Sequence, residues 1–266
     1  MQELETSLPR DLKSLIAGKP YTKDSIGMSG SGIFLFEDMV LKVQKEDEET
    51  RSEAVMMKWL AGKLPVPEVL YHKVENGMNY LLMSKLPGVM SYDESILSDQ
   101  ELVTELLAEG LKKLWTVDIS DCPQRWDLPV KLAVAEANVE NGEVDVDNVE
   151  PETFGEGGFK DPAELLVWLK DHQPPLEPVL SHGDFCLPNI FVQNGKISGY
   201  IDLGKIGIAD KWQDIALCFR SLKHNYNGDY GSARRNDFKE NLLFEKLGIE
   251  PDWEKIRYYI LLDELF

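Results

Sequence analysis

Short strand-like segments separated by turn residues occupy much of the first third of the chain. Four of them pair into two expected hairpins, residues 31–37 with 39–45 and residues 69–74 with 78–84. Asn76-Gly77 separates the second pair and is a strong signal for a tight turn. Helical spacing of apolar residues is present at 3–17 and again at 50–63. The pattern therefore predicts a small, β-rich lobe at the start of the chain.

The rest of the chain has a mostly helical pattern, and Pro87-Gly88 is the expected boundary. Leucine and tryptophan side chains between 98 and 115 lie on one stripe, and Ser98 followed by Glu101 predicts a capping box at the start of that helix. Further helices are expected at residues 133–138, 161–172, 211–223, 235–247 and 252–265, and a loop is expected at 155–158. This part is therefore predicted to be a larger helical lobe.

Polar residues follow three short strands that interrupt the helical part. These strands are expected at residues 178–181, 190–193 and 196–201, and Asn194-Gly195 forms a turn between the last two. Asp184 follows the first strand, Asn189 precedes the second, and Asp202 ends the third. The hairpin is expected to hold Asn189 and Asp202 near each other.

This set of side chains is typical of a kinase active site. Phosphoryl transfer needs a carboxylate that orients the acceptor hydroxyl and takes its proton, and hard oxygen ligands for magnesium ions on the nucleotide. Asp184 can supply the first, and Asn189 with Asp202 can supply the second. The alternative interpretation is an ordinary His-Gly-Asp turn with Asp202 as a surface residue. The spacing and the hairpin favour the kinase site.

The first lobe carries candidates for binding the nucleotide phosphates. The segment 27–32, which contains Ser29, Gly30 and Ser31, can offer backbone N–H groups to anions, although it is no Walker loop. Lys42 lies in the middle of a strand between apolar residues, which is unusual for a solvated face. We expect Lys42 to contact the α- and β-phosphates and Glu53, on the following helix, to be its ion-pair partner.

The chain is strongly acidic, with a net charge of −19 from 47 acidic and 28 basic residues. This balance argues against nucleic acids and anionic membranes as partners and suits a cationic ligand, although solubility alone could explain it. No apolar run approaches the roughly 20 residues of a membrane helix, and the first residues lack a signal peptide's pattern. Three widely spaced cysteines fit a reducing compartment, so a cytoplasmic location is expected.

Three segments of the chain resemble the aminoglycoside 3′-phosphotransferases, or kanamycin kinases. Residues 180–217 contain His-Gly-Asp, Asn-Ile-Phe-Val, Gly-Tyr-Ile-Asp-Leu-Gly and Ile-Ala-Asp-Lys-Trp-Gln-Asp-Ile-Ala. The ending Pro-Asp-Trp-Glu-Lys-Ile-Arg-Tyr-Tyr-Ile-Leu-Leu-Asp-Glu-Leu-Phe, at 251–266, and the segment 56–67 are similar to the same family. The resemblance extends, with gaps, from about Gly27 to Phe266 and is weaker between about 121 and 159.

The resemblance implies an α+β, protein-kinase-like two-lobe fold, with a nucleotide-binding lobe at 1–86 and a catalytic and aminoglycoside-binding lobe at 87–266. It implies phosphorylation of an aminoglycoside at the 3′-hydroxyl by ATP, with GTP as the alternative donor, in the presence of Mg²⁺. The backbone of Met83, Ser84 and Leu86 would form the interlobe hinge that binds adenine. Residues expected to contact the antibiotic are Asp184, Glu152, Asp263, Glu264 and the terminal carboxylate of Phe266.

Three positions depart from the family pattern. Val40 replaces an aromatic residue that stacks on adenine in some relatives, Lys205 stands where an arginine is usual, and the spacer 185–188 lacks an acid found in some relatives. Two alternatives stay open from the residues. One is a kinase of another small hydroxyl compound, such as choline or a sugar, and the other is a catalytically inactive nucleotide-binding module. The oligomeric state is not predicted.

Overall fold

The computed structural model describes the whole chain except residues 1–7, 25–31, 230–232 and 236–237. The described chain divides into two compact units. The first unit contains residues up to Pro87 together with Gly199–Gly204, and the second contains Gly88–Ser198 and Lys205–Phe266. A β-rich unit and a larger helical unit confirm the expected fold class.

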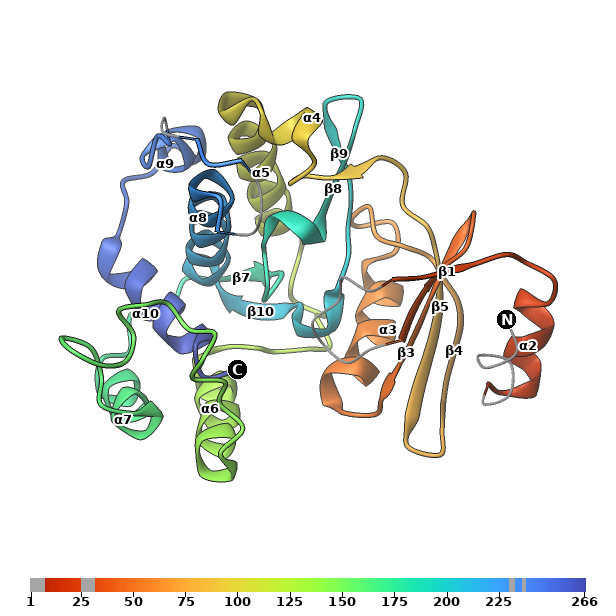
Figure 1. Ribbon diagram of the computed structural model, residues 1–266, viewed down its shortest axis with the longest axis horizontal. Helices are drawn as coiled ribbons and strands as arrows, with labels where there is room; N and C mark the ends of the chain where they lie inside the picture. The colour runs from red at the N-terminus through yellow and green to blue at the C-terminus, as the bar shows by residue number, and fades with distance from the viewer. Residues whose placement is uncertain (1–7, 25–31, 230–232, 236–237) are drawn as a thin grey trace. The chain divides into compact units, whose positions relative to one another are not determined.

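The first unit is built on an antiparallel five-stranded sheet in the order β1-β2-β3-β5-β4 (Figure 1). Its strands are β1 (Thr22–Asp24), β2 (Gly32–Leu35), β3 (Met39–Lys45), β4 (Val69–Glu75) and β5 (Met78–Ser84). Both expected hairpins are present. Asn76 and Gly77 adopt φ of 54° and 72°, the left-handed conformation that a two-residue hairpin turn of this kind requires.

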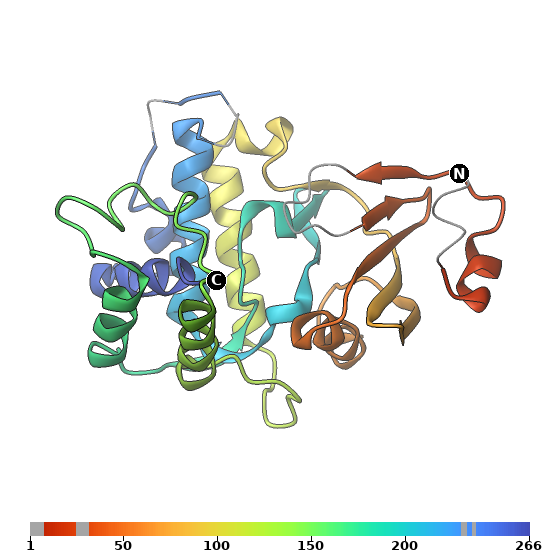
Figure 2. The same ribbon diagram turned by 60° about the horizontal axis from the view of Figure 1, so that its bottom comes forward.

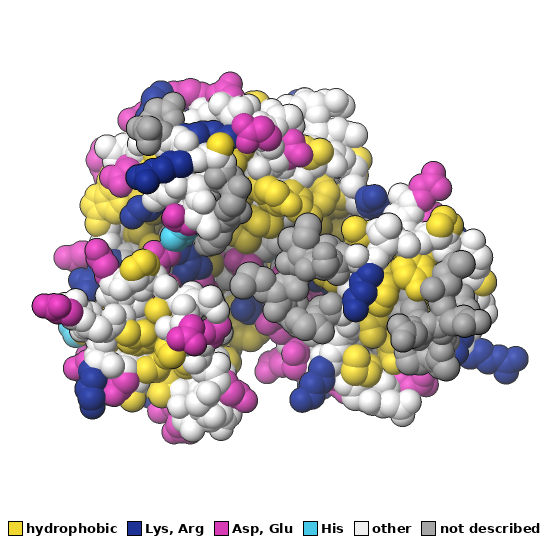
Figure 3. Space-filling model, viewed as in Figure 1, with side chains coloured by type: hydrophobic (Ala, Val, Ile, Leu, Met, Phe, Trp, Pro, Cys, Tyr) yellow, Lys and Arg dark blue, Asp and Glu magenta, His cyan; other side chains and the backbone are white. Residues whose placement is uncertain are grey.

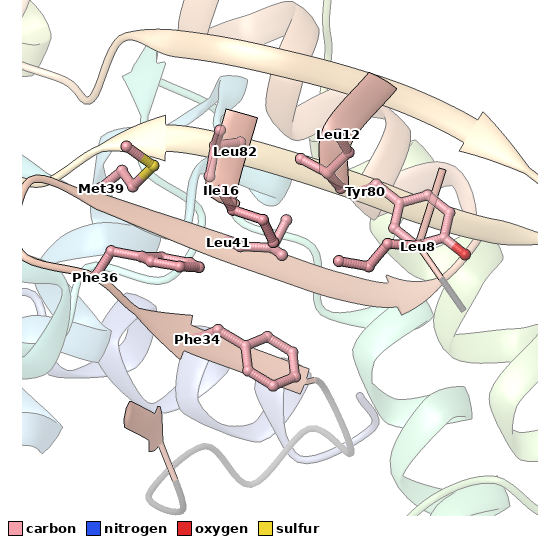
Figure 4. Close-up of a cluster of buried hydrophobic side chains, with 9 residues drawn as sticks. All are labelled: Leu8, Leu12, Ile16, Phe34, Phe36, Met39, Leu41, Tyr80 and Leu82. Carbon is pink, nitrogen blue, oxygen red and sulfur yellow. The ribbon is translucent and has the colours of Figure 1, made fainter. Parts of the chain in front are cut away.

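Two helices cover the sheet, α2 (Arg10–Ile16) on one face and α3 (Glu48–Leu60) on the other (Figures 1 and 2). Figure 4 shows side chains from α2 and the residues before it packed against the strands. Leu41 points into this cluster. Because side chains alternate along a strand, its neighbour Lys42 lies on the face covered by α3. The helix expected at 3–17 is observed over Arg10–Ile16 with Pro9 as its N-cap, and residues 1–7 lie outside the described chain.

The segment Gly199–Gly204 belongs to the first unit, although the sequence placed everything after residue 86 in the second lobe. Three contacts explain its place. The Tyr200 N–H donates to Pro65 O at 3.0 Å, and Gly199 lies so close to Leu86 that a Cβ would be 2.3 Å from its Cδ1. Asp202, in the same segment, bonds to Lys42 at 2.8 Å. This segment therefore brings Asp202 to the sheet of the first unit.

The second unit is mainly helical, with two small sheets. Its helices are α4 (Glu94–Leu97), α5 (Gln100–Trp115), α6 (Leu128–Asn141), α7 (Pro162–Asp171), α8 (Lys211–Asn227), α9 (Leu242–Leu247) and α10 (Trp253–Asp263). One sheet pairs β7 (Pro178–Ser181) with β10 (Gly207–Asp210), and the other has the order β6 (Val89–Met90), β8 (Ile190–Gln193) and β9 (Lys196–Tyr200). The last two residues of β9 belong to the first unit. Two 3₁₀ turns, η1 (Leu187–Asn189) and η2 (Leu203–Lys205), follow β7 and β9 along the chain, η2 spanning the boundary of the units.

Three helix ends differ from the sequence expectation. The capping box at Ser98 is wrong, because Ser98 closes α4 and the Asp99 carboxylate caps α5 by accepting the Leu102 N–H at 3.1 Å. Helix α6 begins at Leu128, several residues earlier than expected. In the segment 235–247 only Leu242–Leu247 is helical among the described residues. Earlier in the segment, the N–H groups of Arg235 and Lys239 donate to Tyr226 O and Gln100 Oε1 instead of forming helical hydrogen bonds.

No helix in the described part of the chain has both the length and the apolar composition needed to cross a membrane.

Candidate active site

Lys42 is the centre of a buried set of ion pairs in the first unit. Its ammonium lies 2.8 Å from Glu53 Oε1 and 2.8 Å from Asp202 Oδ1. The Glu53 side chain is 4% exposed, while that of Asp202 is 50% exposed. Burial alone would lower the pKa of Lys42, but Glu53 and Asp202 outweigh it and hold the pKa above its usual value. Lys42 therefore stays protonated and fixed by two carboxylates.

Local structure explains how Glu53 reaches Lys42. Helix α3 starts with a reciprocal cap, in which Asp47 accepts the Thr50 N–H at 2.8 Å and Thr50 Oγ1 accepts the Asp47 N–H at 3.0 Å. This cap fixes the start of the helix beside β3, and Glu53 lies one turn further on its buried face. The predicted pairing of Lys42 with Glu53 is present in the structure.

Asp202 is held in a left-handed conformation, with φ of 59°, just after β9. Aspartate tolerates this conformation better than most residues. Gly204 lies directly against α3, where a Cβ would be 2.5 Å from Glu49 Cγ and 3.0 Å from Glu49 O. A side chain at position 204 would push the segment away from α3. The close approach at Gly204 thus helps to place the Asp202 carboxylate on Lys42.

Asp184 and Asn189 are joined directly in the second unit. The Asn189 amide donates to Asp184 Oδ2 at 2.9 Å and to Asp184 O at 3.0 Å. Asn189 is 7% exposed, whereas Asp184 is half-buried. Because the amide nitrogen is engaged, the Asn189 carbonyl oxygen is the group left for a cation. The loop leaves the Asp184 carboxylate accessible and fixes its orientation.

Asp214 on α8 anchors the start of this loop, and sequence reasoning missed it. Its buried carboxylate accepts hydrogen bonds from the His182 N–H at 2.7 Å, the Gly183 N–H at 3.0 Å and Ser181 Oγ at 3.0 Å. Burial raises the pKa of Asp214, although these donors oppose the shift. An acidic residue among the apolar residues of 212–219 is the signal that could have identified it.

Replacing Asp214 by asparagine should lower stability and activity together. One amide oxygen cannot satisfy all three donors, and the amide nitrogen would face them, so the unfolding free energy should fall by about 1–3 kcal/mol. Urea denaturation measures this loss, and kcat should fall because the loop before Asp184 loses its anchor. Asp171→Asn, at an exposed position, is the control. A variant with unchanged unfolding free energy would contradict the anchoring role.

The expected hinge residues lie at the end of β5. The Ser84 and Lys85 N–H groups already donate to Glu68 O and Asp38 O, at 2.9 and 3.0 Å. The Leu86 N–H has no acceptor among the described residues and is the donor available to a ligand. Met83 is buried at 4% exposure. The expected phosphate-binding residues Ser29, Gly30 and Ser31 lie outside the described chain.

The acidic end of the chain is buried against Arg220. Arg220 pairs with Asp263 and, at 3.2 Å, with Glu264, whose Oε2 also accepts the Glu150 N–H at 3.1 Å. Burial raises the pKa of Asp263, but Arg220, Lys131 and Lys205 together hold it below its usual value. Burial raises the pKa of Glu264 to about 7 despite Arg220. The two carboxylates are thus structured groups rather than a solvated tail.

The other residues expected to contact the antibiotic, Phe266 and Glu152, lie in different surroundings. The Phe266 ring lies 5.1 Å from Lys131 Nζ and 5.5 Å from Lys205 Nζ. Glu152 is exposed and lines an open pocket of about 560 Å³ together with Lys223 and Arg257. The structure therefore groups Asp263 and Glu264 on Arg220, and it gives Glu152 a separate, open setting.

Each unit contributes one side-chain oxygen that suits the magnesium ion of a nucleotide. Asp202 offers an anionic oxygen, and Asn189 offers a neutral carbonyl oxygen, both of the hard type that Mg²⁺ prefers. Among the described residues no cluster of three or more His, Cys, Asp or Glu side chains could hold a metal by itself.

Comparison with known proteins gives a consistent family. Residues 27–259 match the model of the "Phosphotransferase enzyme family". An aminoglycoside 3′-phosphotransferase of Enterococcus faecalis is 42% identical over 96% of this chain and 97% of its own length. A crystal structure of a type VIII aminoglycoside 3′-phosphotransferase has a TM-score of 0.82 at 26% identity and covers 97% of both chains.

A further solved structure shares the fold at 23% identity, with a TM-score of 0.79 over 96% of this chain and 95% of its own. It is an aminoglycoside phosphotransferase of Streptomyces rimosus in complex with ADP and streptomycin.

Proposed function

Because the chain belongs to the phosphotransferase enzyme family, and within it to the aminoglycoside 3′-phosphotransferases, we propose that it transfers the γ-phosphoryl group of ATP to the 3′-hydroxyl of an aminoglycoside antibiotic and so confers resistance. The observation that carries the proposal is the ion-paired set Lys42, Glu53 and Asp202. It supplies a fixed cation and a half-exposed carboxylate, which are groups of the kind that bind a magnesium nucleotide.

The first unit binds the nucleotide. Lys42, held by Glu53, contacts the α- and β-phosphates, and the Leu86 N–H donates to the adenine edge. Met83 and Ser84 shape the hinge beside it. Val40 gives the base apolar packing without a stacked ring, so selection of ATP over GTP rests on the hinge hydrogen bonds. Ser29, Gly30 and Ser31 are proposed to cover the phosphates.

The second unit binds the acceptor hydroxyl at Asp184. The carboxylate accepts a hydrogen bond from the 3′-hydroxyl, orients its oxygen toward the γ-phosphorus and takes its proton as the new bond forms. The support is the bond from the Asn189 amide to Asp184 Oδ2, which leaves the other carboxylate oxygen for the hydroxyl. Proton acceptance by a positioned carboxylate is the main chemical task of the protein in such a reaction.

Asn189 and Asp202 are the proposed ligands of Mg²⁺, which neutralises charge on the transferring phosphoryl group when bound. Asn189 contributes its carbonyl oxygen, because its amide nitrogen is engaged with Asp184. Asp202 contributes the carboxylate that also contacts Lys42. The protein's own contribution is to hold these oxygens at fixed places on its backbone.

Recognition of the antibiotic is proposed to use the acidic residues Asp263 and Glu264, the terminal carboxylate of Phe266, and Glu152. Aminoglycosides carry several ammonium groups, and the net charge of −19 favours their approach. On the face in Figure 3, Asp and Glu side chains are scattered and mixed with Lys and Arg. Selectivity for the cation therefore rests on individual carboxylates rather than on one acidic surface on that face.

Replacing Asp263 by asparagine should raise KM for kanamycin by roughly tenfold and leave KM for ATP within about twofold, since one charged hydrogen bond contributes about 1.5 kcal/mol or more. Arg220 keeps Glu264 as a partner in this variant, so the fold should survive, whereas deleting 263–266 would remove both of these carboxylates from Arg220. Steady-state kinetics in low and high salt measures the effect, which should shrink in high salt. An unchanged KM for kanamycin would contradict the contact.

Release of ADP across acceptors tests the function. Kanamycin, which has a 3′-hydroxyl, should be turned over, whereas tobramycin, which lacks it, should not. Choline and simple sugars serve as controls for another small-molecule kinase, and no turnover with any acceptor would favour an inactive nucleotide-binding module. None of Cys122, Cys186 and Cys218 forms a disulfide in the described chain, and this supports the reducing, cytoplasmic location proposed here.

A further inference from the structure

His224, in the last turn of α8, lies between two carboxylates. Its Nε2 is 2.5 Å from Glu150 Oε1, and its Nδ1 is 2.8 Å from Asp229 Oδ2. A neutral imidazole has only one N–H, so both contacts are hydrogen bonds only when both ring nitrogens carry a proton. The bonds to Glu150 and Asp229 raise the pKa of His224 and outweigh the opposing effect of burial. The two carboxylates therefore favour the imidazolium form of His224.

Glu150 links His224 to two of the residues proposed to bind the antibiotic. The hydrogen bond from His224 lowers the pKa of the Glu150 carboxyl, although burial opposes the shift. The Glu150 N–H donates to Glu264 Oε2 at 3.1 Å. The Glu150 carbonyl oxygen accepts the Thr153 N–H at 2.9 Å, which closes a turn that contains Glu152. The side chain of Glu150 is thus held by His224, while its backbone orients Glu264 and the turn with Glu152.

Two cations of α8 organise these carboxylates, and they differ in one property. Arg220 and His224 are four residues apart, so they lie on the same face of the helix. Arg220 pairs with Asp263 and Glu264 directly, whereas His224 acts on Glu264 through Glu150. A guanidinium keeps its charge at every pH at which the protein is folded, whereas an imidazolium loses its charge near neutral pH. His224 is therefore the member of this pair that responds to pH.

We propose that His224 is a positioning residue for the acceptor. As an imidazolium it holds Glu150, and through Glu150 it keeps Glu264 and Glu152 in place for the ammonium groups of the aminoglycoside. This inference rests on the proposed function. When His224 loses its proton, one of the two carboxylates faces a nitrogen lone pair, and the bond that remains is no longer charge-assisted. The segment 150–153 is then held less firmly, and the affinity for the aminoglycoside falls.

The direction of the pH dependence follows from the raised pKa of His224. Folding raises this pKa above its ordinary value of 6.5. The stabilisation that the contact with Glu150 provides is therefore complete below about pH 6.5, and it is lost as the pH rises through the folded pKa. We accordingly expect the positioning effect of His224 at acidic and neutral pH and its loss in alkaline solution.

Other charged groups surround the pair of His224 and Glu150. Asp229 follows α8, while Arg220 and Lys223 lie on α8 and lower the pKa of Glu150. Glu264 acts in the opposite direction to His224. Burial raises the pKa of Glu264 to about 7, so Glu264 gains negative charge as the pH rises, and this favours a cationic ligand. The amines of the antibiotic also titrate. The effect of His224 is therefore measured as a ratio between two proteins at the same pH.

The first experiment needs no catalytic activity. The chain has four histidines, so the imidazole signal of His224 in ¹H–¹⁵N spectra is assigned by its absence from His224→Gln. Glu150→Gln should lower the pKa of His224, whereas Glu156→Gln, at an exposed position of the same segment, should leave it unchanged. The protection of the Glu150 amide against hydrogen exchange should fall as His224 loses its proton, and in His224→Gln it should be low at every pH. A Glu150 amide whose protection does not follow the ionisation of His224 overturns the inference.

The second experiment measures the binding of kanamycin by calorimetry at pH 5.5 and at pH 9. His224→Gln imitates the neutral histidine. At pH 5.5 its Kd for kanamycin should be about fivefold above that of the native protein, because a charge-assisted bond has become a neutral one. At pH 9 the two Kd values should be about equal. His224→Lys keeps a cation at both pH values, so its Kd relative to that of His224→Gln should not change with pH. The Kd for ATP should change by less than about twofold in both variants, since they leave Lys42 and Glu53 intact.

The results separate this role of His224 from the proposed function. Phosphorylation of kanamycin together with a ratio of Kd values, His224→Gln to native, that is the same at both pH values overturns the inference alone. Binding of kanamycin with the expected pH dependence but without phosphorylation overturns the proposed function alone. If the native protein binds no kanamycin at either pH, both are overturned.

Discussion

Replacing Asp184 by alanine should lower kcat by about 10²–10⁴-fold, the usual contribution of a positioned acid or base. Asp184 is the proposed acceptor of the hydroxyl proton, and the Asn189 amide bonds to one of its oxygens. Nucleotide affinity should be nearly unchanged, because Lys42 and Glu53 are untouched. Single-turnover kinetics with kanamycin and calorimetry with ATP separate the two effects.

The control for this prediction is Asp171→Ala, which removes an exposed aspartate from the same unit. Asp184→Asn is a second useful variant, since it keeps the size of the side chain and removes its basicity. Both Asp184 variants should fold normally by circular dichroism, because Asp184 is only half-buried. A variant that keeps most of its kcat would show that another group takes the proton.

Replacing Asp202 by alanine should abolish magnesium-dependent binding of ATP. Asp202 is the proposed anionic ligand of Mg²⁺, and it also bonds to Lys42 at 2.8 Å. The variant therefore loses a metal ligand and frees one side of Lys42, while Glu53 keeps that lysine charged and in place. Isothermal calorimetry with and without Mg²⁺ measures the loss.

The matched control is Asp38→Ala, which removes an exposed carboxylate of the same unit that pairs with Lys19 at 3.5 Å. Binding of ATP to that variant should keep its dependence on Mg²⁺. If Asp202→Ala bound Mg²⁺-ATP as tightly as the native protein, the metal would have to be held by other residues.

Local chemistry made the hairpins predictable. Asn76-Gly77 and Asn194-Gly195 are dipeptides that adopt positive φ with little strain, and all four residues do so, with φ between 53° and 72°. The positions of these two dipeptides in the sequence determine which strands pair. The pairing of Lys42 with Glu53 was predicted from the place of Glu53 within the next helix together with the pattern of the family that the chain resembles.

Contacts between distant segments were not predictable in the same way. The sequence placed Asp202 at a strand end but gave no sign that it would bond to Lys42, 160 positions away. The acidic end looked like a group of free carboxylates, and only the packing of α10 on α8 brings Arg220 to Asp263 and Glu264. Arg220 is the lone arginine in the segment 211–223, and nothing in the local sequence indicates that it pairs with the end of the chain.

The burial of Lys131 was also not predictable from the local sequence. It lies between Leu128 and Leu132 on one face of α6, but the expected helix began only at residue 133, so its face was never assigned. Helix α6 and the end of the chain lie side by side in both views (Figures 1 and 2), and Asn138 bonds to Leu265 O at 2.9 Å. That long-range packing, rather than any local pattern, buries the lysine beside Phe266.

The position of the phosphate on the product tests the central claim most directly. Kanamycin, ATP and Mg²⁺ are incubated with the protein, the product is purified, and its ¹H–³¹P correlation spectrum is recorded. We expect one phosphate, whose phosphorus correlates with the proton at carbon 3′. A phosphate on any other hydroxyl, or recovery of unmodified kanamycin, would contradict it.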